Sequence, residues 1–267
     1  MQKTLILLAV LTGIPAAVAW AGETSRVTLD KARLRLIDGG VEDGKRLAGV
    51  QVELSPGWKT YWRVPGESGV PPVFDWSAST NLKDARVLFP APARLHDEGG
   101  EAIGYEGEVI FPVEVEASDP TRPVALKLEL NFAVCQAICI PAQATLAATL
   151  AVDQTVPADR QLLHAWLAKV PAATGGELEV KEAALKPTGE GEGYRLVVRL
   201  DGTSGTPADI FVEGDPELYF GAPRPLDAGF YALPVLGLKQ PDALVGKTLT
   251  LTVVAGARSV VRSVIVR

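Results

Sequence analysis

The two cysteines of the 267-residue sequence, Cys135 and Cys139, are separated by only three residues. A disulfide across so short a loop stabilises a folded chain by about 2 kcal/mol, well below the gain from closing a loop of a hundred residues. Thiol–disulfide exchange, by contrast, needs a second thiol beside the first, because it passes through a mixed disulfide that the second thiol resolves. The spacing therefore indicates a redox couple.

Other uses of the pair stay open at this point. One is a permanent structural clasp. Another is copper(I) binding, since copper(I) prefers soft sulfur ligands, although the only methionine is Met1, which would be lost with a signal peptide. A zinc site would need both His96 and His164 to converge on the cysteines. We expect no cofactor, and no metal outside the copper alternative.

The cysteines end the clearest predicted strand, residues 126–135. Residues alternate between the two faces of a strand, so five apolar side chains share one face and Cys135 lies on the other. With the apolar set in the core, Cys135 is expected to point to the less buried side. Cys139 begins the return strand after a turn, so a hairpin could bring the two within disulfide range. The five apolar residues are Leu126, Leu128, Leu130, Phe132 and Val134.

The chain as a whole is predicted to be all-β. Its 26 glycines and 20 prolines are spread among β-branched runs, which favours many short strands. We expect a β-sandwich over residues 22–152 and a second β-rich domain, also a sandwich, over residues 174–267. A connector at 153–173 carries the one predicted helix, at 158–170, where apolar residues recur at helical spacing.

Residues 1–21 have the features of an export signal. Lys3 precedes an apolar run, and Ala19 and Ala21 are small residues at the positions that signal peptidase reads. An uncleaved anchor is the alternative. Without Lys3 the chain carries 25 basic and 32 acidic residues, which argues against binding to nucleic acid or anionic membranes. No later apolar run is long enough to span a bilayer, so the mature protein is expected to be soluble and periplasmic.

Four separated motifs resemble one known family. They are GWKTYW at 57–62, PGESG at 65–69, GYEGEV at 104–109 and VCQAICIP at 134–141. In this order and at these intervals they resemble the amino-terminal periplasmic domain of DsbD-type thiol:disulfide interchange proteins. The branch linked to suppression of copper sensitivity is the more similar one. The resemblance covers about residues 24–152, and more weakly the second β-rich region.

The resemblance implies an immunoglobulin-like sandwich whose cysteines, Cys135 and Cys139, shuttle two electrons. It implies that a transmembrane partner reduces the pair, which then reduces periplasmic thiol oxidoreductases, disulfide isomerases or the cytochrome c maturation pathway. Cys139 is the one expected to form the mixed disulfide. This activity is that of a protein-disulfide reductase component.

The resemblance also implies a cap loop over the pair. Asp97 and Glu98 lie where that loop falls, but two glycines follow in place of the expected shielding aromatic residue. Tyr61 matches an active-site tyrosine, and Tyr105 could serve as a substitute shield. No transmembrane or thioredoxin-like domain follows, so donor and acceptor are expected to be separate proteins. The alternative function is a scaffold with a structural disulfide that handles copper or binds a partner.

Overall fold

The computed structural model describes residues 25–42, 44–67, 69–97, 100–153, 157–189, 193–203 and 205–267. The predicted signal peptide, residues 1–21, and Glu98 lie outside these ranges. Strands make up about 58% of the chain and helix about 7%, which confirms the all-β prediction. No helix in the described ranges is long and apolar enough to cross a membrane.

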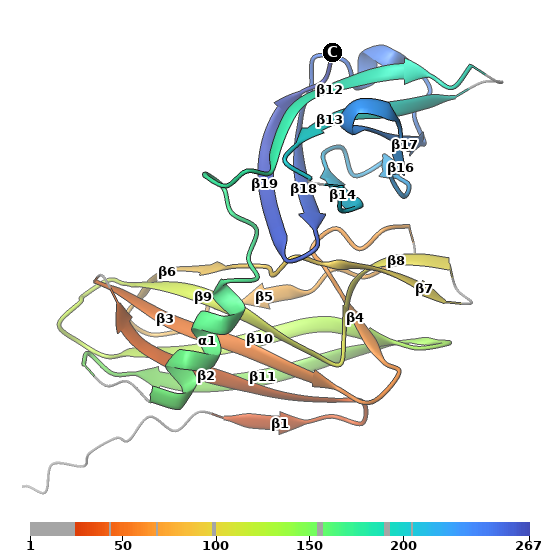
Figure 1. Ribbon diagram of the computed structural model, residues 1–267. Helices are drawn as coiled ribbons and strands as arrows, with labels where there is room; N and C mark the ends of the chain where they lie inside the picture. Colours follow the sequence, from red (N-terminus) through yellow and green to blue (C-terminus); the bar gives the residue numbers. More distant parts are fainter. Residues whose placement is uncertain are drawn as a thin grey trace, which may run out of the picture.

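The strands gather into two lobes, each with its own hydrophobic core (Figure 1). The first lobe is a pair of sheets with strand orders β1-β2-β3-β9-β6 and β11-β10-β4-β8-β7, the latter with β5 added beside β10. The predicted domain boundaries stay a prediction. The strands of this lobe are β1 (Arg26–Thr28), β2 (Ala32–Glu42), β3 (Lys45–Leu54), β4 (Lys59–Tyr61), β5 (Val73–Asp75), β6 (Leu82–Val87), β7 (Ala93–Asp97), β8 (Gly100–Glu106), β9 (Glu108–Ala117), β10 (Val124–Cys135) and β11 (Cys139–Leu150).

The core of the first lobe lies between its two sheets. The apolar face of β10 is buried there as predicted, with each of its five side chains at most 4% exposed. Val50, Val52 and Ile110 of the other sheet belong to the same buried cluster. Strict alternation along β10 thus builds the wall of the core to which the cysteine pair is attached.

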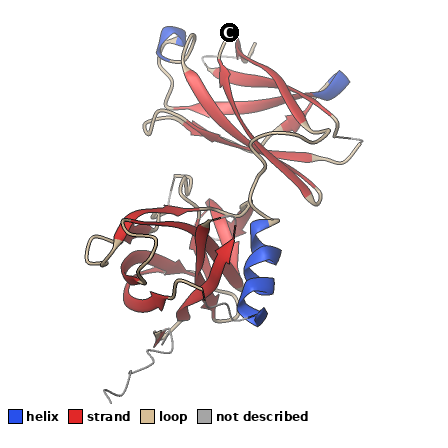
Figure 2. Ribbon diagram, turned by 90° about the vertical axis from the view of Figure 1, so that its left-hand side faces the viewer, coloured by secondary structure: helices blue, strands red, loops and turns tan. Residues whose placement is uncertain are grey.

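The one α-helix of the described residues, α1 (Pro157–Leu167), packs on the outside of the first lobe (Figure 2). Leu163 is fully buried in the contact. The helix can approach because two glycines face it: a Cβ added at Gly39 or Gly49 would lie 2.6 or 2.4 Å from a methyl carbon of Leu163. The predicted helix therefore exists, and it covers a sheet as well as connecting the lobes.

The second lobe contains a sheet ordered β12-β13-β17-β15, with β16 paired to β17, and a sheet ordered β14-β18-β19. Leu196, Val198 and Leu251 are fully buried between them. Its elements are β12 (Glu179–Pro187), β13 (Tyr194–Asp201), β14 (Ala208–Glu213), β15 (Tyr219–Phe220), β16 (Arg224–Pro225), the 3-10 turn η1 (Asp227–Gly229), β17 (Phe230–Leu236), the 3-10 turn η2 (Pro241–Ala243), β18 (Thr248–Ala255) and β19 (Arg258–Ile265).

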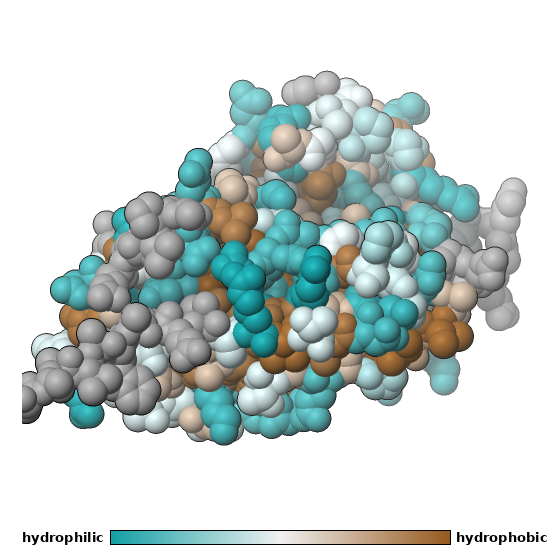
Figure 3. Space-filling model, turned by 90° about the horizontal axis from the view of Figure 1, so that it is seen from below, coloured by the Kyte–Doolittle hydropathy of each residue, from teal (hydrophilic) through white to brown (hydrophobic). Residues whose placement is uncertain are grey.

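The underside of the first lobe mixes hydrophilic residues with smaller apolar areas (Figure 3). This mixture is the ordinary state of a protein surface, of which more than half is contributed by apolar atoms. The view therefore marks no single face as a docking surface.

The fit of Leu163 against the two glycines leads to a first prediction. Leu163→Ala should lower the free energy of unfolding by about 2–5 kcal/mol, because it removes a fully buried side chain and leaves a cavity on the sheet. Gln161→Ala on the exposed side of α1 is the matched control and should change it by less than about 0.5 kcal/mol. Urea denaturation measures both, and equal effects would contradict the docking of α1.

Candidate functional site

The disulfide joins Cys135, the last residue of β10, to Cys139, the first residue of β11. The two residues are direct register partners, with their Cα atoms 4.1 Å apart. Between them the chain turns through residues 136–138, and the backbone N–H of Gln136 donates to the carbonyl of Ile138 at 3.1 Å. The hairpin thus holds both cysteines at one tip of the sheet.

The two cysteines differ in exposure. Cys135 is 0% exposed, whereas Cys139 is exposed and the neighbouring Ile138 is 69% exposed. Cys135 lies on the predicted side of β10, which is exposed at Lys127, Glu129 and Asn131, but the end of that side is buried. There Cys135 forms a small buried cluster with Tyr61, Ala102 and Ala133, so it is less exposed than expected. Of the two cysteines, Cys139 is therefore the more open to an attacking thiolate.

The hydroxyl of Tyr61 lies against both sulfurs. It donates a hydrogen bond to Sγ of Cys135 at 2.8 Å and lies 3.1 Å from Sγ of Cys139. Burial raises the pKa of Tyr61 above its ordinary value, so the hydroxyl keeps its proton at neutral pH. A protonated hydroxyl can stabilise the negative charge that develops on sulfur when the S–S bond breaks.

Short-range contacts of β4 place this tyrosine. The hydroxyl of Thr60 donates to the carbonyl of Ala133 on β10 at 2.9 Å. On the other side β4 pairs with β8, with Tyr61 opposite Gly104. A Cβ at Gly104 would lie 2.0 Å from the carbonyl oxygen of Thr60, so only glycine lets the strands approach this closely.

The loop after β4 covers the ring of Tyr61. The carbonyl of Pro65 accepts a hydrogen bond from the N–H of Ile103 at 2.9 Å, which ties the loop to β8. A Cβ at Gly69 would lie 2.8 Å from Cδ1 of Tyr61, so the loop passes directly over the ring. The PGESG motif at 65–69 was predicted only as a family motif, with no role at the site. Its two glycines were the sequence feature that could have indicated a close approach to another residue.

Tyr105 occupies a different place from the one expected. It pairs with Thr60, so strand alternation turns it to the opposite side from Tyr61, into the sandwich core. There its hydroxyl donates to the carbonyl of Pro90 at 2.8 Å and its ring packs edge-on against Phe111. Burial raises its pKa well above the ordinary value. Tyr105 therefore does not shield the disulfide.

The remaining candidate residues do not add to the described site. The backbone of Asp97 pairs with Gly100 at the end of β7, but its side chain, like Glu98, lies outside the described part of the chain. The two histidines are apart from each other and from the cysteines: His96 is 3.3 Å from Glu101, and His164 on α1 is 3.1 Å from Glu42.

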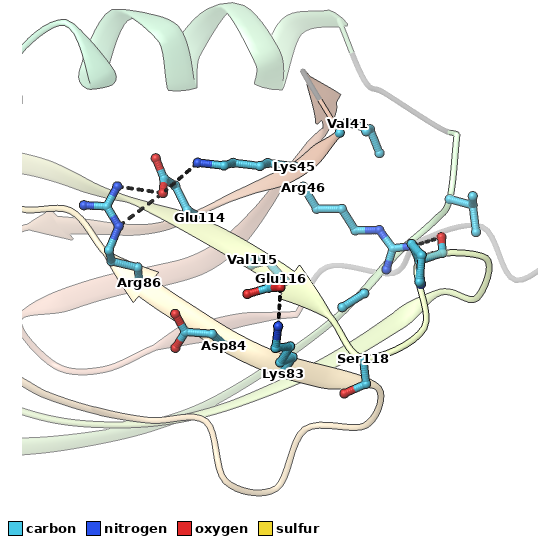
Figure 4. A pocket seen from close by; sticks show the side chains of 14 residues that line it. Val41, Lys45, Arg46, Lys83, Asp84, Arg86, Glu114, Val115, Glu116 and Ser118 are labelled. Atoms are coloured by element: carbon cyan, nitrogen blue, oxygen red, sulfur yellow. Dashed lines mark hydrogen bonds and ion pairs between the residues drawn. The ribbon is translucent and has the colours of Figure 1, made fainter.

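A surface pocket of about 760 Å³ lies on the other sheet of the first lobe, over β3, β6 and β9 (Figure 4). Four of its charged side chains form two ion pairs: Arg86 lies 2.6 Å from Glu114, and Lys83 lies 2.6 Å from Glu116. None of its described lining residues belongs to β4, β8 or β10. The pocket is therefore separate from the disulfide site.

Residues 35–151 match the family of the thiol:disulfide interchange protein DsbD, N-terminal. The region that they form is here called the DsbD-type domain. The resemblance seen in the sequence is thereby confirmed for the first lobe, and its fold is immunoglobulin-like.

The DsbD-type domain and the second lobe together resemble solved structures, among them the N-terminal periplasmic domain of ScsB from Proteus mirabilis. The TM-score is 0.71 at 24% identity, over 92% of this chain and 98% of that chain. At this identity the likeness concerns the fold, and it includes both lobes. No curated protein matches the sequence.

The contact between β4 and β8 of the DsbD-type domain yields a second prediction. Gly104→Ala should lower the free energy of unfolding by at least about 2 kcal/mol, because a backbone oxygen must move to admit the methyl group. Gly193→Ala is the control, since its Cβ meets only ordinary contacts, and should change it by less than about 0.5 kcal/mol. Urea denaturation measures both variants, and equal losses in the free energy of unfolding would contradict the close approach of β4 and β8.

Tyr61 of the DsbD-type domain gives a third prediction, on alkaline stability. Its pKa is raised in the folded state, so its contribution to stability is complete below the unfolded value of about 10 and is lost as pH rises through the folded-state pKa. The free energy of unfolding should therefore fall more steeply in wild type than in Tyr61→Phe as the pH rises above about 10. Parallel pH profiles in urea denaturation would refute the assignment.

Proposed function

We propose that this chain is a periplasmic thiol:disulfide interchange module that passes electrons from a membrane-embedded donor to periplasmic thiol oxidoreductases or isomerases. The observation that carries the proposal is the asymmetry of the pair: one sulfur is accessible, and the other is buried beneath a tyrosine hydroxyl. The family match of residues 35–151 supports the same chemistry.

The exchange runs in two displacements. A thiolate of the donor attacks Sγ of Cys139, the bond to Cys135 breaks, and Cys135 leaves as a thiolate that accepts the hydrogen bond of Tyr61. The second thiolate of the donor then attacks the other donor sulfur, which is bonded to Cys139 in the mixed disulfide, and Cys139 is released as a thiolate. The donor dithiol is oxidised to a disulfide, and the pair gains two electrons and, at neutral pH, two protons. The reverse sequence reduces the acceptor.

The donor dithiol and the acceptor disulfide have to be supplied by cysteines other than this pair. The sequence holds two cysteines, and both belong to this pair. The apolar Ile138 beside Cys139 offers contact area for such partners. The predicted export signal supports a periplasmic location. No observation on the described residues favours the copper alternative.

The reduction potential is the test of this function and our fourth prediction. Wild-type protein equilibrated with glutathione or dithiothreitol buffers should show a reversible couple at about −200 to −270 mV, the range of exchange proteins. A potential well below about −300 mV would mean a structural clasp and would overturn the proposal.

Single-cysteine variants serve as the matched pair for this test. With Cys135→Ala, the exposed Cys139 should accumulate a stable mixed disulfide with oxidised glutathione, because no resolving thiol remains. With Cys139→Ala, the buried Cys135 should react much more slowly. Mass spectrometry measures both, and equal rates would contradict the assigned point of attack.

A further inference from the structure

The second lobe contacts the disulfide domain mainly through strand β14, whose two faces belong to different cores, with Val254 of β18 also packed against the first core. Ile210 and Val212 are buried in the core of the second lobe. Phe211, between them, is 1% exposed and belongs to the core cluster of the first lobe. Alternation along a strand explains the division, because neighbouring side chains point to opposite faces. Figure 1 shows β14 on the side of the second lobe that faces β7 and β8.

The face of β14 that meets the first lobe is apolar in the middle and charged on both sides. Phe211 packs on Trp62 with ring centroids 5.8 Å apart. Glu213 accepts two hydrogen bonds from Arg63, at 2.8 and 2.7 Å. Asp209 accepts three hydrogen bonds, at 2.9 to 3.2 Å, from Arg94, whose side chain is only 7% exposed. Paired, bidentate and largely desolvated contacts of this kind impose a defined geometry.

These partners are joined directly to the disulfide site. Trp62 and Arg63 are the two residues that follow Tyr61 along the chain. Arg94 also forms an ion pair with Glu101, which precedes Ala102 of the small cluster around Cys135. The second lobe thus contacts the two residues directly after β4 and, through Arg94 of β7, is linked to β8.

Strand β4 is short and has few backbone pairs. It is three residues long, and its register with β10 consists of one pair, Lys59 with Cys135. Its register with β8 consists of three pairs. A hydroxyl that must stay 2.8 Å from one sulfur and 3.1 Å from another needs its strand held closely. The contacts of Trp62 and Arg63 with β14 supply that support.

We propose that Phe211 and Glu213 of the second lobe are positioning residues for the disulfide, holding β4 so that the hydroxyl of Tyr61 stays against the two sulfurs. The second lobe then sets the reactivity of the pair in the first. This inference rests on the proposed function, because it concerns how readily the same disulfide opens.

The rate at which dithiothreitol reduces the disulfide of the full chain tests this, and is our fifth prediction. Tyr61→Phe should slow reduction about tenfold, since it removes the hydrogen bond to the leaving thiolate. Phe211→Ala should slow it by at least about threefold, and Phe211→Leu, which keeps most of the buried volume, by less than about twofold. Val198→Ala weakens the core of the second lobe on β13, in the sheet that does not contain β14, and should leave the rate within about twofold of wild type.

The double variant separates positioning from general destabilisation. If Phe211 acts through Tyr61, Tyr61→Phe combined with Phe211→Ala should be no slower than Tyr61→Phe alone. Three results would each overturn the inference: a double variant in which the two rate reductions multiply, a wild-type rate in Phe211→Ala, or a wild-type rate in Tyr61→Phe. Where Phe211→Ala does not fold, Glu213→Gln takes its place, and is expected to slow reduction in the wild-type background but not in Tyr61→Phe.

Failure of this inference and failure of the proposed function give different results. The inference compares reduction rates among variants and stands or falls on those ratios. The proposed function depends on the reversible potential of the wild-type pair. A reversible couple with unchanged variant rates removes only the positioning role of the second lobe. A potential far below the exchange range removes the function, whatever the ratios.

Discussion

The contact between the hydroxyl of Tyr61 and the two sulfurs is the interaction on which the organisation of the first lobe depends. It requires that a strand pair with β10 at the point where the cysteine hairpin begins. Strand β4 does this, and its Tyr61 packs with Ala102 and Ala133 around Cys135, which is buried while Cys139 stays exposed. The difference between the two cysteines therefore comes from the residues packed around Cys135, not from the hairpin itself.

Close backbone approach is the condition for this arrangement. The glycine at position 104 lets β8 come near β4, and the loop of residues 65–69 can pass over the ring because Gly69 carries no side chain. Burial then keeps the hydroxyl of Tyr61 protonated and able to donate to sulfur. Packing and electrostatics act together here, since the same covering that excludes water also sets the protonation state.

The second lobe belongs to the same chain of contacts. Its strand β14 contributes one face to each core, and Arg63 and Arg94 clamp it by ion pairs on either side of Phe211. An apolar centre flanked by charge pairs favours one relative placement of two surfaces, because mispairing would leave a desolvated charge without a partner. This explains how a lobe without cysteines can influence a disulfide that it does not touch.

Local pattern in the sequence determined several features by itself. Alternation along residues 126–135 predicted the buried face of β10, the spacing of the cysteines predicted a hairpin pair, and helical periodicity predicted α1. These are properties of neighbouring residues, so they can be recognised without knowing the rest of the fold. The family motifs added a role for Tyr61, and the structure places its hydroxyl against the sulfurs.

Tertiary structure decided the rest, because each remaining feature depends on which distant segment covers a given face. Periodicity identifies the two faces of β10 but not that Tyr61 and Ala102 pack on the end of the second, so Cys135 was expected to be more exposed than it is. Tyr105 is in the core because it pairs with Thr60, not with Tyr61, and therefore points to the opposite face from Tyr61. The bridging position of Phe211 likewise arises from a contact between residues 149 positions apart in the sequence, Trp62 and Phe211, which no local pattern contains.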